Sequence, residues 1–382
     1  MFSQEIMEAC AGKCQAQLRQ LIRDLCAIPA PSGREERRAE FCLNWFRTHC
    51  TPQAFVDEAL NVICPWGGTE GGSLTVVMAH TDTVFPDLEP MAFSEDETRF
   101  YCPGVTDDTA QLAVMMVCAR ELMAHCTPPD TGIVFVANAC EEGLGNLKGC
   151  RKIMETYGGR VKEFVTLDGT SLTGCVSRAV GSHRWRVTVS TEGGHSFNAF
   201  GNANAIHLLS GLVTRLYEQP VPEKEGTKTT YNVGMISGGT SVNTIAQEAS
   251  LLYEYRSDDR ACLAQMEARF RDLIHRARAR GIRVETEQIG CRPCGGPVDP
   301  VRQEALLERA AASIRKITGR EPEFRSGSTD CNIPLSQGIP AVCIGACAGG
   351  GCHTREEYLE LDSLQDGCRL VLDFLYTTLY QQ

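Results

Sequence analysis

The sequence predicts an α/β fold with a mixed, largely parallel central sheet flanked by helices, and with an inserted ferredoxin-like α+β domain. Two observations predict it. Apolar, β-branched runs of strand length, each ending at polar residues, alternate with longer segments of helical periodicity. In the middle of the chain this pattern changes to a β-α-β-β-α-β order. We therefore expect one domain in two parts, residues 1–180 and 293–382, around an insertion at 181–292.

The N-terminal part begins with two predicted helices. Apolar residues at helical spacing predict the first helix over residues 7–27. Ser32 is expected to cap the second helix, with Glu35 and Glu36 in its first turn. The elements expected after these two are strands at 55–62 and 74–79, a helix at 111–123, strands at 132–138 and 164–167, a helix at 302–317 and a strand at 339–344.

The insertion is recognised by its half-exposed strands. Residues 182–191 alternate around Trp185, Val187 and Val189, which is typical of an antiparallel strand with one buried face. The other expected elements are helices at 202–216 and 266–278 and strands at 229–236, 249–255 and 282–289.

Composition limits the possible partners and the compartment. A formal net charge of −11 argues against nucleic acid or an anionic membrane as a partner. No apolar run is long enough to span a bilayer, and no secretory leader is recognised. The 20 cysteines are scattered and show no compact framework, so we expect reduced thiols and a cytoplasmic location. The single CxxC, Cys291 to Cys294, lacks a second pair and predicts a turn between domains.

Polar residues follow several of the predicted strands. In an open α/β sheet, ligands bind beyond the carboxyl ends of the strands, so these residues are expected to meet. Imidazole and carboxylate groups are donors that zinc accepts, and a hydrolytic site keeps one position open for water. The sequence therefore predicts a metal site built from His80, Asp107, Asp108, Glu141, Glu142, Asp168 and His353.

Residue chemistry leaves open which member of each adjacent carboxylate pair binds metal. Glu141 and Glu142 are expected to point in opposite directions from an extended segment, so that one binds metal and the other faces the substrate as a base. Asp82 is placed to orient the His80 imidazole. The alternative for Asp107 and Asp108 is simple capping of the helix that follows them.

The motifs, in their order, resemble the dinuclear zinc exopeptidase and deacylase family of peptidase T, glutamate carboxypeptidase, aminoacylase and succinyl-diaminopimelate desuccinylase. The resemblance covers nearly the whole chain. The matching segments are Ile28–Gly33, His80–Asp82, Gly104–Asp108, Glu141–Gly143, Asp168–Gly169, Gly194–Ser196, Gly239–Asn243, Ser328–Asp330 and Cys352–Thr354. Thr109 and Ala110 depart from the Lys-Gly that many relatives have there.

The resemblance implies two zinc ions per chain, for which Co²⁺ or Mn²⁺ could substitute. Asp107 would bridge them, and a cis peptide bond would join it to Asp108. Glu141 would be the general base that deprotonates a zinc-bridged water, and Asp82 would orient His80. The other implied metal ligands are His80 and Asp168 on one ion and Glu142 and His353 on the second.

The resemblance also gives roles to residues of the insertion, which would be a dimerisation and lid domain. His195 would reach the active site of a second subunit and polarise the scissile carbonyl, which implies a homodimer. Asn243 and Arg256 would contact the substrate. The alternative for His195 is a turn histidine that caps the next helix. The alternative for Arg256 is an ordinary ion pair within a strand. Surface or core positions are expected for His49, His125, His183, His207 and His275.

The predicted function is that of a metal-dependent hydrolase that cleaves an amide bond of a di- or tripeptide. An N-acyl-amino-acid deacylase would use the same site and is the main alternative. A non-enzymatic metal- or peptide-binding protein is a further alternative. It predicts loss of the base or of metal ligands, whereas Glu141, Asp82 and all five expected ligands are present. A serine hydrolase is not indicated, because the sequence contains no GxSxG elbow.

Overall fold

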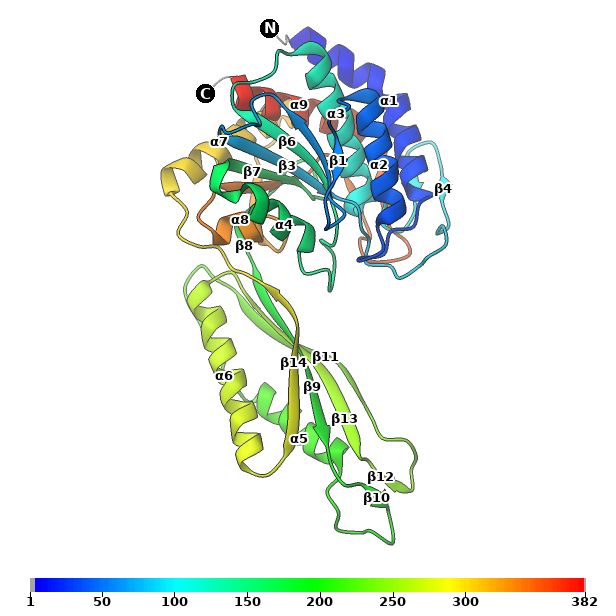
Figure 1. Ribbon diagram of the computed structural model, residues 1–382, viewed down its shortest axis with the longest axis vertical. Coiled ribbons are helices and arrows are strands. Elements are labelled where there is room, and N and C mark those ends of the chain that lie inside the picture. The colour runs from blue at the N-terminus through cyan, green and yellow to red at the C-terminus, as the bar shows by residue number, and fades with distance from the viewer. Residues whose placement is uncertain (1–3, 381–382) are drawn as a thin grey trace. The chain divides into compact units, whose positions relative to one another are not determined.

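The computed structural model describes residues 4–380, which divide into two compact units. The first unit comprises the described residues up to Ala179 and those from Gly296 onward, and the second comprises Val180–Gly295. Figure 1 shows the first unit as helices around a large sheet and the second as a smaller sheet with helices beside it.

The first unit is built on an eight-stranded sheet in the order β1-β2-β6-β3-β7-β16-β8-β15. Strand β3 is parallel to both β6 and β7, and β7 is parallel to β16, while β2 is antiparallel to β6. The fold class predicted from the sequence, a mixed and largely parallel sheet flanked by helices, is confirmed. The strands are β1 (Phe55–Val56), β2 (Val62–Trp66), β3 (Leu74–His80), β6 (Gly132–Asn138), β7 (Val161–Leu167), β8 (Gly174–Ala179), β15 (Glu323–Gly327) and β16 (Ala341–Ile344).

Helices cover both faces of this sheet, in keeping with the almost complete burial of its central strands β3, β6 and β7. Val77 and Ala79 of β3 belong to the cluster formed with α1, α2, α3, α7 and α9, whereas Val76 and Met78 point to the other face, where α4 and α8 pack. The helices are α1 (Gln4–Cys26), α2 (Glu36–His49), α3 (Gln111–His125), α4 (Lys148–Tyr157), α7 (Pro300–Thr318), α8 (Asn332–Ser336) and α9 (Ser363–Tyr380), with a short 3₁₀ turn at Gly158–Arg160.

A second, small sheet of the first unit has the strand order β17-β18-β5-β4. Its strands are β4 (Ser94–Glu95), β5 (Arg99–Tyr101), β17 (Gly349–Gly350) and β18 (Tyr358–Glu360). Two local predictions for this unit were wrong. One strand was expected at 55–62, but the chain forms two antiparallel strands there, β1 and β2. Ser32 does not cap α2, whose N-cap is Glu35, because the Ser32 hydroxyl donates instead to Asp82 Oδ2 at 2.6 Å.

The antiparallel sheet β11-β13-β9-β14 and the helices of the second unit follow the predicted β-α-β-β-α-β order, and two further short strands, β10 and β12, form a separate pair. Its core lies between the sheet and the helices, with Trp185, Tyr253 and Phe270 among its largest members. Strand β11 is an edge strand and is mostly exposed. The elements are β9 (Gly181–Ser190), β10 (Gly194–His195), α5 (Ala205–Tyr217), β11 (Thr229–Gly238), β12 (Thr244–Ile245), β13 (Glu248–Ser257), α6 (Arg260–Ala279) and β14 (Arg283–Arg292).

The two cysteines of the CxxC motif are not joined by a disulfide. Cys291 lies within β14, and the Cys294 thiol donates to the Ser257 carbonyl at 2.9 Å. All 20 cysteines of the sequence fall within the described residues, and none of them forms a disulfide. Between residues 4 and 380, no helix combines the length and the apolar character that crossing a membrane requires.

Candidate metal centre

The carboxyl ends of the parallel strands bring the predicted site residues together. His80 is the last residue of β3, and Asp168 directly follows β7. Glu141 and Glu142 follow the end of β6 by a few residues, and His353 lies in the loop between β17 and β18. Because β3, β6 and β7 are parallel neighbours, their ends lie at one edge of the sheet, as the strand-end rule predicts.

Asp107 reaches this edge from a single π-helical turn, Val105–Ala110, that precedes α3. The backbone leaves the helical conformation there, with φ −112° and ψ 87° at Asp107. The peptide bond between Asp107 and Asp108 is cis, as the resemblance implied. The alternative of simple helix capping is not what the structure shows, since neither this turn nor α3 has a side-chain cap. Asp108 instead accepts a hydrogen bond from the His80 backbone N–H through Oδ2, at 2.8 Å.

The Asp107 carboxylate lies between two histidines. Its Oδ1 is 3.2 Å from His80 Nε2, and its Oδ2 is 3.1 Å from His353 Nε2. The same His353 nitrogen is 3.1 Å from Glu142 Oε1. Possible donor atoms lie within 4.8 Å of one another in three overlapping sets, which are His80 with Asp107 and Asp168, Asp107 with Glu142 and His353, and His80 with Glu141 and Glu142. Two of these sets share Asp107.

The charges of this cluster favour a cation. Burial, followed by the nearby Asp107 and Glu141 carboxylates, raises the pKa of Asp168 well above its usual value. Hydrogen bonds to Asp107 and then Glu142 raise the pKa of His353 to about 10. Without a bound cation the cluster therefore retains protons, and binding of a cation would displace them. Imidazole nitrogens and carboxylate oxygens suit zinc, cobalt or manganese, so the residues present fit such ions.

Asp82 holds the parts of the cluster in place. Its Oδ1 accepts from the Glu141 backbone N–H at 3.0 Å, and its Oδ2 accepts from the Glu142 N–H at 2.9 Å. His80 Nδ1 is 3.0 Å from the Asp82 backbone carbonyl and 3.4 Å from its Oδ1. Asp82 therefore contacts the His80 ring with both its backbone and its side chain.

The expectation that Glu141 and Glu142 point in opposite directions was wrong. Their carboxylates lie within 4.8 Å of each other and of His80. The backbone is not extended here, because Cys140 and Gly143 on either side have positive φ values of 60° and 51°. In such a turn, neighbouring side chains are not forced to opposite faces as they are in a strand.

Glu357 is a supporting residue that the sequence did not indicate. It is buried, and its carboxylate accepts from the backbone N–H groups of Gly104 at 2.7 Å, Thr106 at 2.9 Å and Asp107 at 2.9 Å. Burial raises its pKa to about 7, even though these three hydrogen bonds lower it. Glu357 therefore fixes the turn that presents Asp107, from a loop 250 residues away in the chain.

Replacement of Glu357 with glutamine is expected to loosen this turn. Glutamine keeps one oxygen that can accept hydrogen bonds. Its NH2 group, which only donates, would face a backbone N–H and leave that N–H without an acceptor. We expect a loss of about 1–3 kcal/mol in unfolding free energy, with weaker metal retention. Denaturant unfolding and metal analysis would measure both. Glu356→Gln, at an exposed neighbouring position, is the matched control. If Glu356→Gln had the same effects as Glu357→Gln, the proposed supporting role of Glu357 would be contradicted.

Further buried polar side chains join the loops of the site. The Glu35 carboxylate accepts from the Cys140 N–H at 3.0 Å, and the Arg38 guanidinium donates to the Thr81 carbonyl at 2.8 Å. Gln111 joins the loops after β7 and β16, because its side chain accepts from the Ala346 N–H at 2.6 Å and donates to the Gly169 carbonyl. In the sequence, the signal for Glu35 and Arg38 is limited to their position beside the Ile28–Gly33 motif.

The remaining predicted site residues lie in the second unit. His195 is exposed, and its Nδ1 accepts from the backbone N–H groups of Phe197 at 3.2 Å and Asn198 at 3.4 Å. Asn243 lies close to His195: the Asn243 backbone carbonyl accepts a hydrogen bond from the Ser196 backbone N–H at 2.9 Å. Arg256 forms the ion pair considered as its alternative, with both Nε and Nη2 near the Glu254 carboxylate at 3.0 and 3.1 Å. Its substrate-binding role stays a prediction.

Comparisons with known proteins are consistent with this geometry. The sequence profile of Peptidase family M20/M25/M40 matches residues 76–377. A putative succinyl-diaminopimelate desuccinylase from Mycobacterium tuberculosis is 23% identical over 93% of this chain and 97% of its own. A tripeptidase structure from Staphylococcus aureus has a TM-score of 0.78 at 22% identity, covering 96% of this chain and 99% of its own. An aminopeptidase PepT structure from Bacillus cereus has a TM-score of 0.72 at 21% identity, covering 94% and 97%.

Proposed function

Because the chain belongs to Peptidase family M20/M25/M40, a family of metal-dependent hydrolases, we propose that it cleaves an amide bond of a di- or tripeptide. One observation carries the proposal: the two oxygens of the Asp107 carboxylate face two different histidines, His80 and His353. A carboxylate in this position suits a pair of metal ions that share one bridging ligand. We propose zinc for both ions, with Co²⁺ or Mn²⁺ as substitutes.

The proposed ligands follow from the sets of donor atoms that share Asp107. His80 and Asp168 would hold one ion together with Asp107, and Glu142 and His353 would hold the second. When bound, the ions would supply Lewis-acid activation of the scissile carbonyl and would lower the pKa of water.

Glu141 is the proposed general base. Its carboxylate lies within 4.8 Å of donor atoms of His80 and Glu142, and its side chain is almost fully buried. From this position it can accept a proton from the attacking water and return it to the leaving amine. Asp82 would keep the Glu141 backbone and the His80 ring in the required orientation through the contacts described above.

His195 is the proposed donor to the oxygen of the scissile carbonyl. Because Nδ1 accepts from two backbone N–H groups, the neutral ring carries its proton on Nε2. That N–H can donate to the negative charge that develops on the carbonyl oxygen. Asn243, beside His195, and Arg256 are proposed to contact the substrate.

An N-acyl-amino-acid deacylase is the second candidate. It is favoured by the desuccinylase relative, which aligns over 93% of this chain. A structural likeness at 22% identity, such as that to the tripeptidase, supports the fold only. The two candidates share the proposed catalytic residues, so only substrates can distinguish them. The net charge of −11 supports a small-molecule substrate and not nucleic acid or an anionic membrane surface.

Metal removal and replacement test the proposed function. We expect about two metal ions per chain, a loss of hydrolysis on chelation and its recovery when zinc is added back. Tripeptides, dipeptides, N-acetyl amino acids and N-succinyl amino acids would be assayed side by side. Turnover of the acylated set alone would replace the peptidase proposal by the deacylase. Hydrolysis that survives full metal removal would contradict both.

We further propose a homodimer formed through the second unit. Strand β11 is an edge strand with exposed Met235 and Ile236, which are 56% and 55% exposed. An exposed apolar edge is a surface that proteins normally cover. Pairing with a second copy would cover it, and His195 would then serve the active site of the other subunit.

Hybrid dimers test this arrangement. His195→Ala and Glu141→Gln homodimers are each expected to have lost most activity. In a hybrid dimer, the subunit with an intact Glu141 would receive an intact His195 from its partner. Co-expression and isolation of the mixture should therefore restore about a quarter of the native activity, because half of the random dimers contain one complete site. A mixture no more active than its two parents would contradict a shared site.

A cytoplasmic location is proposed from the cysteines. None of the 20 forms a disulfide, and 16 of them are buried. Free thiols persist in reducing compartments, whereas secreted proteins commonly convert nearby cysteines to disulfides.

A further inference from the structure

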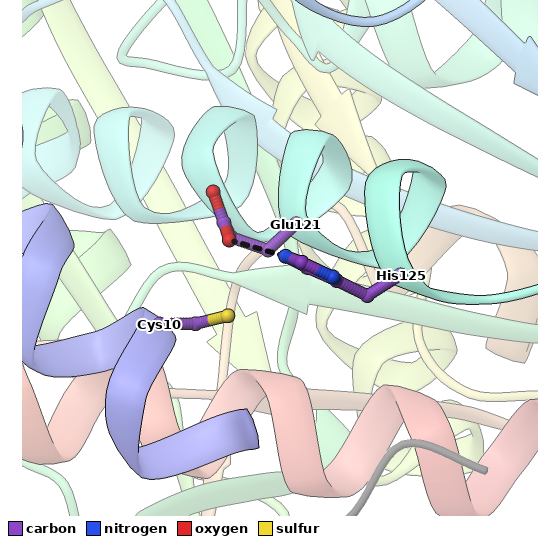
Figure 2. Close-up of side chains that lie close together, drawn as sticks. All are labelled: Cys10, Glu121 and His125. Carbon is purple, nitrogen blue, oxygen red and sulfur yellow. Dashed lines mark ion pairs between the residues drawn. The ribbon is translucent and has the colours of Figure 1, made fainter.

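A second group of metal-binding side chains lies in the helical layer of the first unit. Cys10 comes from α1, and Glu121 and His125 come from α3. Figure 2 shows the Cys10 sulfur and the His125 ring both directed toward the Glu121 carboxylate. The donor atoms of the three residues lie within 4.8 Å of one another, and none of them belongs to the strand-end cluster.

Helix packing accounts for this convergence. Glu121 and His125 are four residues apart and therefore lie on the same face of α3. Helix α1 packs against that face and contributes the Cys10 thiol. Cys10 and Glu121 are 6% and 9% exposed, whereas the His125 side chain is 44% exposed. The group is thus anchored in the protein and open to solvent on the histidine side.

The two oxygens of Glu121 have different partners. Oε1 accepts from the Arg120 guanidinium, with Nε at 2.8 Å. Oε2 faces His125, whose Nε2 is 3.5 Å away. Burial, then the hydrogen bond to Glu121 and its charge, raise the pKa of the Cys10 thiol to about 12. The Cys10 thiol therefore keeps its proton beside the Glu121 carboxylate, and a cation bound between them would displace it.

We propose that Cys10, Glu121 and His125 form a binding site for a borderline-soft divalent cation such as zinc. The ligands would be Cys10 Sγ, Glu121 Oε2 and His125 Nε2, with water completing the coordination on the exposed side. Thiolate, imidazole and carboxylate are all zinc ligands, and the thiolate disfavours magnesium and calcium. As the ion binds, the thiol proton passes to solvent and the sulfur–metal bond replaces the S–H bond.

The site would be structural. It would join α1, near the start of the chain, to the long helix α3 that begins at the strand-end cluster. An ion that binds only the folded protein stabilises it increasingly as its concentration exceeds the dissociation constant. The alternative is an ordinary ion pair between Glu121 and His125 on the surface of one helix, which would not need the Cys10 thiol.

Cobalt(II) distinguishes the two interpretations. Cobalt thiolate bonds give an intense near-ultraviolet charge-transfer absorption, and the proposed ligands of the strand-end site are only imidazoles and carboxylates. We expect the full-length protein to show a saturable cobalt thiolate band from about one Co²⁺ per chain, in addition to the ions that the strand-end site would take up. Cys10→Ala and His125→Ala should each abolish it. Because the His125 side chain is 44% exposed, its replacement is not expected to impair folding.

Cys126→Ser is the matched control, since this thiol is adjacent to His125 but outside the group of three. It should retain the band, and Zn²⁺ should raise the melting temperature of this control more than that of His125→Ala. Any of three results would overturn the proposal. The native protein could lack the band, the band could survive Cys10→Ala or His125→Ala, or the band could be lost in Cys126→Ser. The spectrum does not depend on peptide hydrolysis, so failure of the proposed function would leave this test valid.

Discussion

Replacement of Glu141 with glutamine is expected to lower kcat by about 10²–10⁴-fold, the usual contribution of a general base. The amide of the new side chain would nearly match the buried carboxylate in size but could not accept the proton of water. The proposed metal ligands, including the neighbouring Glu142, would be unchanged. Metal content per chain should therefore remain at its native value, which would be measured on the same preparation as kcat.

Glu142→Gln is the matched comparison for this prediction. The two residues are adjacent, similarly buried and held through their backbones by the same Asp82 carboxylate. Only Glu142 is placed 3.1 Å from His353, so its replacement should reduce metal content as well as turnover. If Glu141→Gln lost metal and Glu142→Gln did not, the roles of base and ligand would be exchanged.

The strand ends could be predicted because their signal is local. The apolar run of β6 was expected at 132–138 and is found there, and β3 ends at His80, one residue beyond its predicted end. Once β3, β6 and β7 are recognised as parallel, the residues after them must meet, whatever the loops do. This is why His80 and Asp168 were identified without knowledge of any contact.

The geometry of the loops could not be predicted in the same way. Glu141 and Glu142 follow a strand, but a left-handed conformation at Cys140 turns the chain so that both carboxylates face the cluster. Ser32 has the sequence context of an N-cap, and its hydroxyl binds Asp82, a partner 50 residues away. Local propensity suggests what a side chain can do, but tertiary contacts decide which partner it takes.

Glu357 and the Cys10 group show the same limit on a larger scale. Glu357 acts on three backbone N–H groups about 250 residues earlier, and no periodicity encodes that distance. His125 was expected at a surface or core position because it lies outside every motif. Its proximity to Cys10 follows only from the packing of α1 on α3. The candidate site with short-range signals was therefore found, and the one that depends on helix packing was not.

The largest effect is expected from Asp107→Asn. Asparagine keeps one oxygen and replaces the other with an amide nitrogen that cannot bind a cation, so one histidine would lose its shared carboxylate oxygen. The neutral side chain would also remove the negative charge between the two proposed ions. We expect loss of at least one ion and a fall in kcat no smaller than the ~10²–10⁴-fold expected for a lost base.

Asp108→Asn is the informative comparison, because residue chemistry alone left open which of the two aspartates binds metal. Asp108 Oδ2 accepts from the His80 backbone N–H, a role that an asparagine oxygen can fill. We therefore expect Asp108→Asn to retain both ions, measured by metal analysis after equal dialysis of the two variants. If Asp108→Asn lost metal and Asp107→Asn kept it, Asp108 would be the bridging ligand, and the two histidines would contact Asp107 only as hydrogen-bond partners.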